Sequence, residues 1–201
     1  MAEILTILGA RPQFIKASMV SRALKAVGHT QEKVLHTGQH YDPSMSDIFF
    51  EELGMETPQY NLGIGGGTHG QNTGRMIEGI ESVLINEKPD WVLVYGDTNS
   101  TLAGAVAASK LSIPVAHVES GLRSFNRKMP EEINRVIVDH ISSVHFTPTD
   151  LATKNLVREG IDHSSIHQTG DVMYDAALFF GGQSDGEAPQ VGDLISDKKP
   201  F

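Results

Sequence analysis

The stretch from residue 90 to residue 135 constrains the fold of this chain more than any other. Two short apolar runs, residues 91–95 and 114–118, have the length and composition of strands buried on both faces of a parallel sheet. The Ala- and Leu-rich residues 101–110 between them predict the crossover helix that joins such strands. This β–α–β unit predicts an α/β fold.

The rest of the chain repeats the alternation of strands and helices. Further strands are predicted at residues 4–8, 33–37, 60–62, 143–147 and 166–169, and helices at residues 12–27, 43–53, 70–86, 130–141, 150–159 and 172–180. This pattern is typical of a doubly wound, Rossmann-like parallel sheet. We expect residues 1–180 to form one domain and residues 181–201, rich in Gly, Ser, Asp and Pro, to form a linker or the start of a second domain.

Composition narrows the classes of partner. The formal net charge is −9, and the 16 basic side chains are scattered along the chain, which argues against nucleic acid or an anionic membrane as a partner. There is no cysteine, so disulfides and thiolate metal sites are excluded. The first apolar run, residues 4–8, is too short for a signal peptide or a membrane span. A cytoplasmic protein is therefore expected.

Acidic side chains follow the ends of the two central strands. Asp97 lies just past the first, Glu119 ends the second, and Glu131 opens the next helix with Arg135 one turn on. Ligands of open parallel sheets bind outside the carboxyl ends of the strands, and neighbouring carboxylates there provide a general acid and a general base. The structural alternatives are that Asp97 caps the following helix and that Glu131 only pairs with Arg135; for Glu132 we expect only such a structural role.

The first strand-to-helix turn, GARP at residues 9–12, is a second candidate. It lacks the GxGxxG pattern, so a dinucleotide cofactor is not expected, but the start of a helix favours an anion that Arg11 and Lys16 would reinforce. The alternative is that both are surface cations of an ordinary helix. The glycine-rich residues 63–67 have no GK[ST] sequence after them and are interpreted as a loop.

Histidine and serine residues give weaker signals. His36 and His40 are four residues apart, but a turn separates them and no carboxylate spacing completes a metal site, so no metal is expected. His117 is either a core histidine or a proton carrier. Ser120 and Ser124 have no evident base, which leaves a hydrolase triad unsupported.

Five ordered motifs carry a family resemblance that extends from residue 4 to about residue 175. They are GARPQFIK (9–16), TGQHYDPSMSD (37–47), YGDTNSTLAGA (95–105), HVESGLRS (117–124) and PEEINR (130–135). These motifs resemble those of the bacterial non-hydrolysing UDP-N-acetylglucosamine 2-epimerases. That family has two Rossmann-like domains in the arrangement of GT-B glycosyltransferases, with the active site between them.

The resemblance implies an isomerase that interconverts UDP-N-acetylglucosamine and UDP-N-acetylmannosamine. UDP leaves C1 as the C2 proton is removed, and it adds back after reprotonation on the opposite face, without a redox cofactor. The resemblance also implies a cytoplasmic homodimer that supplies polysaccharide synthesis.

The resemblance assigns roles to matching residues. Arg11 and Lys16 would contact the nucleotide-diphosphate side of the substrate, and Asp97, Glu119 and Glu131 would handle the C2 proton or the sugar.

Four more residues have implied roles. Arg135 would orient Glu131. Gln39, His40 and Arg75 would lie near the cleft and a second, regulatory nucleotide-sugar site.

Two departures from the family pattern leave alternatives open. The RPQFIK motif with Gln13 also resembles relatives that act on UDP-2,3-diacetamido-glucuronate. The family's second domain is absent from this sequence, so the chain reads as an excised or truncated half that is inactive alone, with an apolar patch near residues 181–201. The other readings are a non-catalytic nucleotide-sugar-binding or dimerisation module and half of a GT-B glycosyltransferase.

Overall fold

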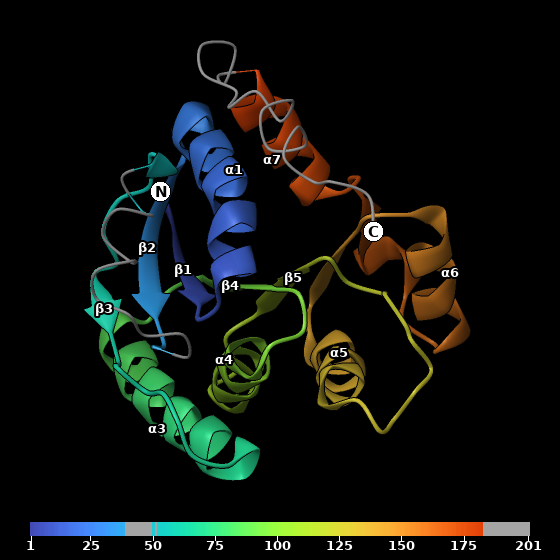
Figure 1. The fold of residues 1–201 in the computed structure, drawn as a ribbon, viewed down its shortest axis with the longest axis horizontal. Coiled ribbons are helices and arrows are strands. Elements are labelled where there is room, and N and C mark those ends of the chain that lie inside the picture. Colours follow the sequence, from blue (N-terminus) through green and yellow to red (C-terminus); the bar gives the residue numbers. More distant parts are fainter. Residues whose placement is uncertain (39–49, 51, 183–201) are drawn as a thin grey trace, which may run out of the picture.

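The computed structural model describes residues 1–38, 50 and 52–182, and its centre is a seven-stranded sheet whose paired strands are all parallel (Figure 1). The strand order is β3-β2-β1-β4-β5-β6-β7. The strands are β1 (Ala2–Leu8), β2 (Thr30–His36), β3 (Tyr60–Asn61), β4 (Trp91–Tyr95), β5 (Val115–Val118), β6 (Val144–Thr147) and β7 (Ile166–Gln168). The order reverses between β1 and β4, so this pair marks the topological switch point of a doubly wound, Rossmann-like fold, as the sequence predicts.

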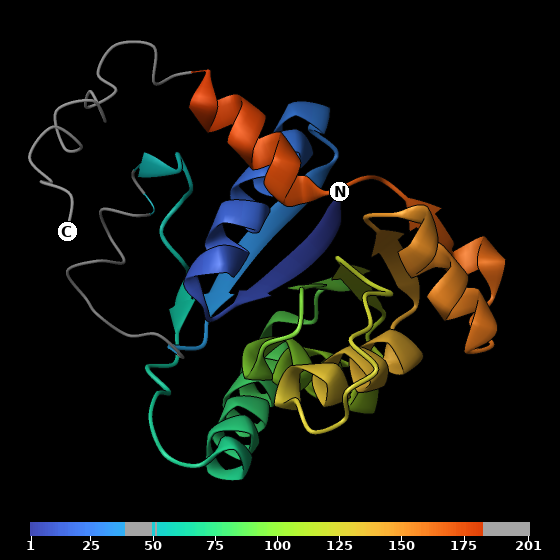
Figure 2. The ribbon, with the colours of Figure 1, turned by 45° about the vertical axis from the view of Figure 1, so that its right-hand side comes forward.

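Helices cover both faces of the sheet. They are α1 (Arg11–Val27), α3 (His69–Glu87), α4 (Asn99–Lys110), α5 (Pro130–Ile141), α6 (Asp150–Arg158) and α7 (Val172–Gly181). Figure 2 shows α1 and α7 on one face and α3, α4 and α5 side by side on the other. Right-handed crossovers place the helices that follow β3, β4 and β5 on one face, because the chain there moves across the sheet in one direction.

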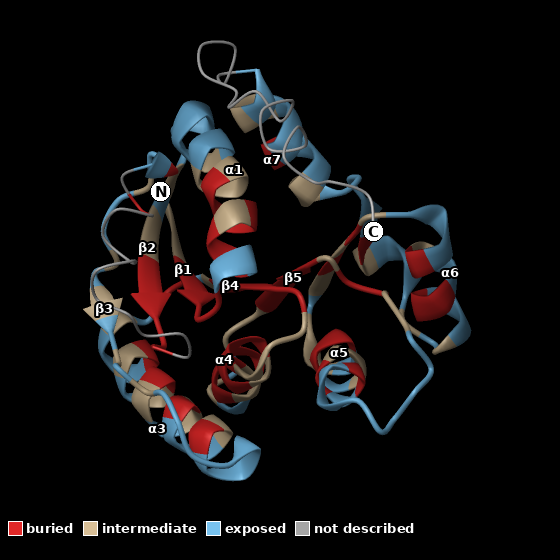
Figure 3. Cartoon of the chain, in the orientation of Figure 1, coloured by how far each residue is buried: buried red, intermediate tan, exposed pale blue. Residues whose placement is uncertain are grey.

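Successive side chains of each strand point to opposite faces of the sheet, so the core is divided into two clusters. On β5, Val115 belongs to the cluster under α3, α4 and α5, whereas Ala116 and Val118 belong to the cluster under α1. Figure 3 shows that β4 and β5 are buried along most of their length. The near-continuous apolar runs that predicted these strands therefore reflect burial on both faces.

The predicted elements are confirmed within a few residues wherever the structure describes them. Helix α4 begins at Asn99, two residues before its predicted start, because the Thr98 hydroxyl caps it. Strand β3 has only two residues. Most of the helix predicted at residues 43–53, and most of the linker predicted at residues 181–201, lie outside the described residues.

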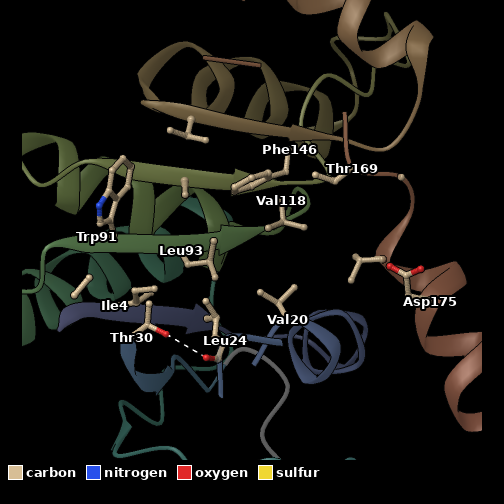
Figure 4. A pocket seen from close by; sticks show the side chains of 15 residues that line it. Ile4, Val20, Leu24, Thr30, Trp91, Leu93, Val118, Phe146, Thr169 and Asp175 are labelled. Atoms are coloured by element: carbon tan, nitrogen blue, oxygen red, sulfur yellow. Dashed lines mark hydrogen bonds between the residues drawn. The ribbon is translucent and has the colours of Figure 1, made fainter. Parts of the chain in front are cut away.

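An apolar groove of about 520 Å³ opens on the sheet face between α1 and α7 (Figure 4). The apolar lining residues labelled in Figure 4 are Ile4, Val20, Leu24, Trp91, Leu93, Val118 and Phe146. Helix α7 contributes Val172 and the acidic Asp175. The groove thus reaches α7, the last helix that the structure describes. In the part of the chain that the structure describes, no helix is long and apolar enough to cross a membrane.

Candidate functional site

The candidate site lies at the carboxyl edge of the sheet, where the loops after β1, β4 and β5 meet. Gly96 follows β4 and Glu119 follows β5, and the Gly96 N–H donates to Val118 O at 2.9 Å, which holds the two loops together. A side chain at Gly96 would place its Cβ 3.1 Å from Glu119 Oε2 and 3.5 Å from Lys16 Nζ. Glycine at this position lets the Glu119–Lys16 ion pair lie directly against the loop that carries Asp97.

Asp97 is held by helix α5. Arg135 donates from Nη2 at 2.6 Å and from Nε at 2.9 Å to Asp97 Oδ2, and Asn134 Nδ2 donates to the Asp97 carbonyl at 2.8 Å. The cap of α4 is Thr98, so the alternative in which Asp97 caps this helix is wrong. The capping hydroxyl leaves the Asp97 carboxylate free to project from the loop toward α5.

Arg135 does not orient Glu131, which corrects the role that the family resemblance implied. Its second partner is Glu132, which it reaches at 2.8 Å. Glu131 is exposed on the first turn of α5, and its side chain makes no hydrogen bond or ion pair among the described residues. The structure therefore separates the two glutamates: Glu132 is structural, as expected, and the Glu131 carboxylate is open to a ligand.

Glu132 fixes the loop that leads into α5. Its carboxylate accepts the backbone N–H groups of Ser124 at 2.9 Å and Phe125 at 2.8 Å. Burial alone would raise the pKa of Glu132, but these donors and Arg135 outweigh burial and lower the pKa to about 2. The carboxylate is thus ionised at neutral pH and connects the loop to Arg135 and, through it, to Asp97.

Glu119 has an unusual backbone conformation. Its φ is +71°, in the left-handed region that non-glycine residues rarely occupy. Such a conformation costs about 1–3 kcal/mol and is typical of functional sites. The Glu119 N–H donates to Phe146 O at 3.1 Å, and its carboxylate forms an ion pair with Lys16, a buried residue of α1. This conformation turns the acid of β5 toward the helix that starts at the first predicted phosphate turn.

Gln13 has a structural role that the sequence did not reveal. Its side-chain oxygen accepts the N–H groups of Gly9 at 2.8 Å and Ala10 at 3.0 Å, and its amide donates to Tyr95 O at 2.8 Å and to Thr101 Oγ1 at 2.9 Å. The side chain is 1% exposed. Gln13 therefore joins the β1–α1 turn to the β4–α4 turn and is fully used within the protein.

Asp139 is the centre of a buried polar network that sequence reasoning missed. Its carboxylate contacts His117 Nδ1 at 2.7 Å and accepts from Ser120 Oγ at 2.7 Å and Arg123 Nη1 at 2.7 Å. Burial opposes ionisation, but His117 and the other donors hold the pKa of Asp139 below its usual range. One signal was present: Asp139 lies seven residues after Glu132, which places both acids on one face of α5.

Arg123 extends this network to helix α6. It donates from Nε at 2.8 Å and from Nη2 at 2.7 Å to the two oxygens of Glu159, a bidentate ion pair. Burial opposes the charge of Arg123, but Glu159 and Asp139 raise its pKa above the usual value. Ser120 and His117, which the sequence left without clear roles, both serve this network.

The remaining predicted residues are placed as follows. Arg11 is the exposed first residue of α1, and Arg75 is exposed on α3, where it donates to Gly66 O at 2.9 Å. Gln39 and His40 lie outside the described residues, so the predicted regulatory group stays a prediction.

Histidine 36 packs in the core rather than at the edge of the site. His36 is 1% exposed and its ring lies 5.1 Å from that of Phe14, and burial lowers its pKa. In the described ranges, no group of three or more His, Asp or Glu side chains could hold a metal ion.

This geometry defines a class of protein: a Rossmann-like domain that carries carboxylates and cations at the carboxyl edge of its sheet. The family profile for UDP-N-acetylglucosamine 2-epimerases matches residues 22–198. The chain therefore belongs to the UDP-N-acetylglucosamine 2-epimerase family.

Three relatives illustrate the similarity. The UDP-2,3-diacetamido-2,3-dideoxy-D-glucuronate 2-epimerase of Pseudomonas aeruginosa is 56% identical over 199 residues, which cover 96% of this chain and 56% of that protein. The UDP-N-acetylglucosamine 2-epimerase of Methanocaldococcus jannaschii is 57% identical over 172 residues, 86% of this chain and 47% of that protein. A crystal structure of a Methanocaldococcus jannaschii UDP-GlcNAc 2-epimerase in complex with UDP-GlcNAc and UDP has a TM-score of 0.89 and 52% identity, covering 96% of this chain and 52% of that one. The chain thus spans about half the length of the relatives it matches.

Proposed function

We propose that this chain is the N-terminal half of a non-hydrolysing 2-epimerase that interconverts UDP-N-acetylglucosamine and UDP-N-acetylmannosamine. The observation that carries the proposal is the meeting of Asp97 and the Glu119–Lys16 pair at the switch-point edge of a chain of this family. Inversion at C2 requires a base on one face of the sugar and an acid on the other, and a set of carboxylates can supply both.

Each proposed site residue has a distinct part in this chemistry. Asp97, Glu119 and Glu131 would remove the C2 proton, return it and hold the sugar. Lys16 and Arg11, at the start of α1, would face the diphosphate, because the N-terminus of a helix and its cations favour an anion. UDP leaves and returns within one site, so its retention matters as much as the proton transfer.

The other half of such an enzyme would complete the site. We propose that residues 1–180 form the N-terminal domain and that residues 181–201 lead to a second domain across the cleft. Alone, the 201-residue chain would be inactive or nearly so, because half a cleft neither excludes water nor holds UDP through the elimination. The complete enzyme would be a cytoplasmic homodimer that supplies polysaccharide synthesis.

Asp97→Asn tests the proposal in a chain joined to the second half that its relatives carry. Proton NMR of UDP-N-acetylglucosamine in deuterated water would follow the C2 proton. The joined wild-type chain should exchange this proton and form the manno epimer, and Asp97→Asn should lower the rate by about a hundredfold or more. Asp150→Asn, at an exposed acid of α6, is the matched control and should leave the rate unchanged.

A non-catalytic nucleotide-sugar-binding module makes the opposite prediction. It would bind UDP-N-acetylglucosamine without exchange of the C2 proton. Asp97→Asn would then leave the proton NMR spectrum of the sugar nucleotide unchanged. That result would overturn the epimerase proposal.

A second substrate is favoured by the 56% identity to the Pseudomonas aeruginosa UDP-2,3-diacetamido-2,3-dideoxy-D-glucuronate 2-epimerase. The same proton-exchange measurement with that sugar nucleotide separates the two substrates. A higher ratio of kcat to KM for the diacetamido sugar would assign the chain to that reaction.

A further inference from the structure

The buried histidine of strand β5 lies directly beneath the two acid-bearing loops. His117 is completely buried, and its ring joins two segments of the chain. Nδ1 lies 2.7 Å from Asp139 Oδ1 on α5, and Nε2 lies 2.7 Å from the carbonyl oxygen of Gly96. Gly96 is the residue just before Asp97, and His117 stands two residues before Glu119.

The hydrogen-bond partners define where the ring protons are. A backbone carbonyl can only accept, so His117 Nε2 must donate to Gly96. The Asp139 carboxylate already accepts hydrogen bonds from Ser120 Oγ and from Arg123 Nη1. The Gly121 N–H also donates to it at 3.1 Å, so the carboxylate receives three donors besides His117, one of them a guanidinium. Asp139 is therefore an ionised acceptor, and His117 Nδ1 must donate as well.

The charge of the whole cluster agrees with this proton count. Asp139 and Glu159 carry two negative charges, and Arg123 supplies one positive charge, so His117 as an imidazolium makes the cluster neutral. Buried charges are tolerated only when they are paired, which favours the neutral sum. Further titratable groups contact the cluster: His140 Nε2 lies 3.3 Å from Glu159 Oε2 at its half-exposed edge, and His145 Nε2 lies 2.7 Å from the backbone carbonyl oxygen of Asp139.

We propose that His117 is a doubly protonated positioning residue, which holds the Gly96–Asp97 loop and the Glu119 turn through its two N–H groups. The role of His117 in turnover rests on the proposed epimerase function. The protonation of His117 does not rest on it. One N–H fixes the Gly96 carbonyl beneath the Glu119–Lys16 pair. The other anchors the ring to Asp139, which also accepts the hydroxyl of Ser120, the residue after Glu119.

His145 provides an internal comparison on the neighbouring strand. It pairs with His117 in the register of β5 and β6 and is 2% exposed. Its Nε2 donates to the backbone carbonyl of Asp139 at 2.7 Å, but its Nδ1 faces the hydroxyl of Ser165 at 3.3 Å. The Ser165 hydroxyl has one proton, which it gives either to the Asp162 carbonyl at 2.8 Å or to His145 Nδ1. No acceptor-only group faces Nδ1 of His145, so its contacts do not require an imidazolium.

Nitrogen–proton NMR of the histidine rings in the 201-residue chain tests the protonation. His117 should show protons on both ring nitrogens near neutral pH, because each nitrogen faces a hydrogen-bond acceptor. His145 should show one ring N–H. The variants His117→Gln and His145→Gln assign the signals. A single ring N–H on His117 near neutral pH would overturn the proposal.

Kinetics of the chain joined to a second half test the positioning role. His117→Gln should lower kcat for C2 inversion by about tenfold to a hundredfold, with KM changed by less than about twofold, because misplaced acids slow the chemistry more than they weaken binding. His145→Gln should leave kcat within about twofold. Equal losses in the two variants would refute a positioning role for His117. If the joined wild-type chain does not exchange the C2 proton, the proposed function fails, while the NMR result still decides the protonation of His117.

Discussion

The two faces of the sheet differ in how completely they are covered. On β5, Val115 and His117 face helices α4 and α5, where the packing is closed and even charged groups are buried in pairs. Ala116 and Val118 face the other side and line the apolar groove between α1 and α7 (Figure 4). One strand of four residues thus contributes to a sealed polar network and to an open apolar surface.

The difference follows from topology. Crossover helices after β3, β4 and β5 all fall on one face. Among the described residues, α1 and α7 cover the opposite face over β4, β5 and β6, and the groove opens between them. The closed face can hold buried charges because every member of the network has a partner. The open face contains apolar side chains, which cost free energy when water contacts them. Stability should therefore respond differently to substitutions on the two faces.

The largest expected effect comes from removing the centre of the polar network. Asp139→Ala leaves Arg123 and His117 without their shared carboxylate and should lower the free energy of unfolding by about 3–5 kcal/mol. Urea unfolding, followed by the fluorescence of the single tryptophan, Trp91, measures this. Asp150→Ala, which breaks an exposed pair with Lys154, should cost less than about 1 kcal/mol. Similar losses in both variants would contradict the burial argument.

The second-largest effect is expected at low pH, where protonation of Glu132 on the closed face should lower the stability. The folded-state pKa of Glu132 is about 2, below its usual value of 4.5, so its contribution to stability is complete above about pH 5 and is lost as the pH falls toward 2. Urea unfolding over this range should show stability falling with pH. Glu132→Gln, which cannot titrate, should reduce the slope, and an unchanged slope would show that other groups cause the acid loss.

The smallest expected changes in stability come from adding side-chain atoms to each face of the sheet, which compares the packing of the two faces directly. Gly104→Ala places a Cβ 2.9 Å from Ile7 Cδ1 and 3.2 Å from Val94 Cγ1 and should cost about 1–3 kcal/mol. Ala116→Leu extends into the groove and should change stability by less than about 1 kcal/mol. Thermal unfolding of both variants is the measurement. A loss for Ala116→Leu as large as that for Gly104→Ala would show that the groove is closed in solution.

Much of the fold could be predicted because its signals are local. The sequence itself shows the apolar runs of strand length. It also shows Pro12 at the start of α1 and Gly28 at its end. The acids Asp97 and Glu119 were predictable because a parallel sheet brings the ends of its central strands to one edge. The element boundaries shifted by a few residues: β2 begins at Thr30, three residues before its predicted start, and α4 begins directly after the capping residue Thr98.

The partners of these acids could not be predicted in the same way. Arg135 and Glu131 are one helical turn apart, yet Arg135 contacts Asp97, which is 38 residues away, and its neighbour Glu132. Gln13 reaches across 82 residues to Tyr95. A hydrogen bond depends on distances of a few ångströms between packed elements, and sequence spacing does not encode such distances.

The sequence by itself thus determined the alternating fold, the edge at which the acids gather and the family to which their motifs point. The packing of the helices on the sheet decides which acid each cation holds, that Glu131 is open while Glu132 is buried, and that the His117 ring lies between Asp139 and the Gly96 carbonyl. The physical reason is that periodicity and strand ends are properties of the chain, whereas charge pairing in a dry interior depends on how helices pack against the sheet.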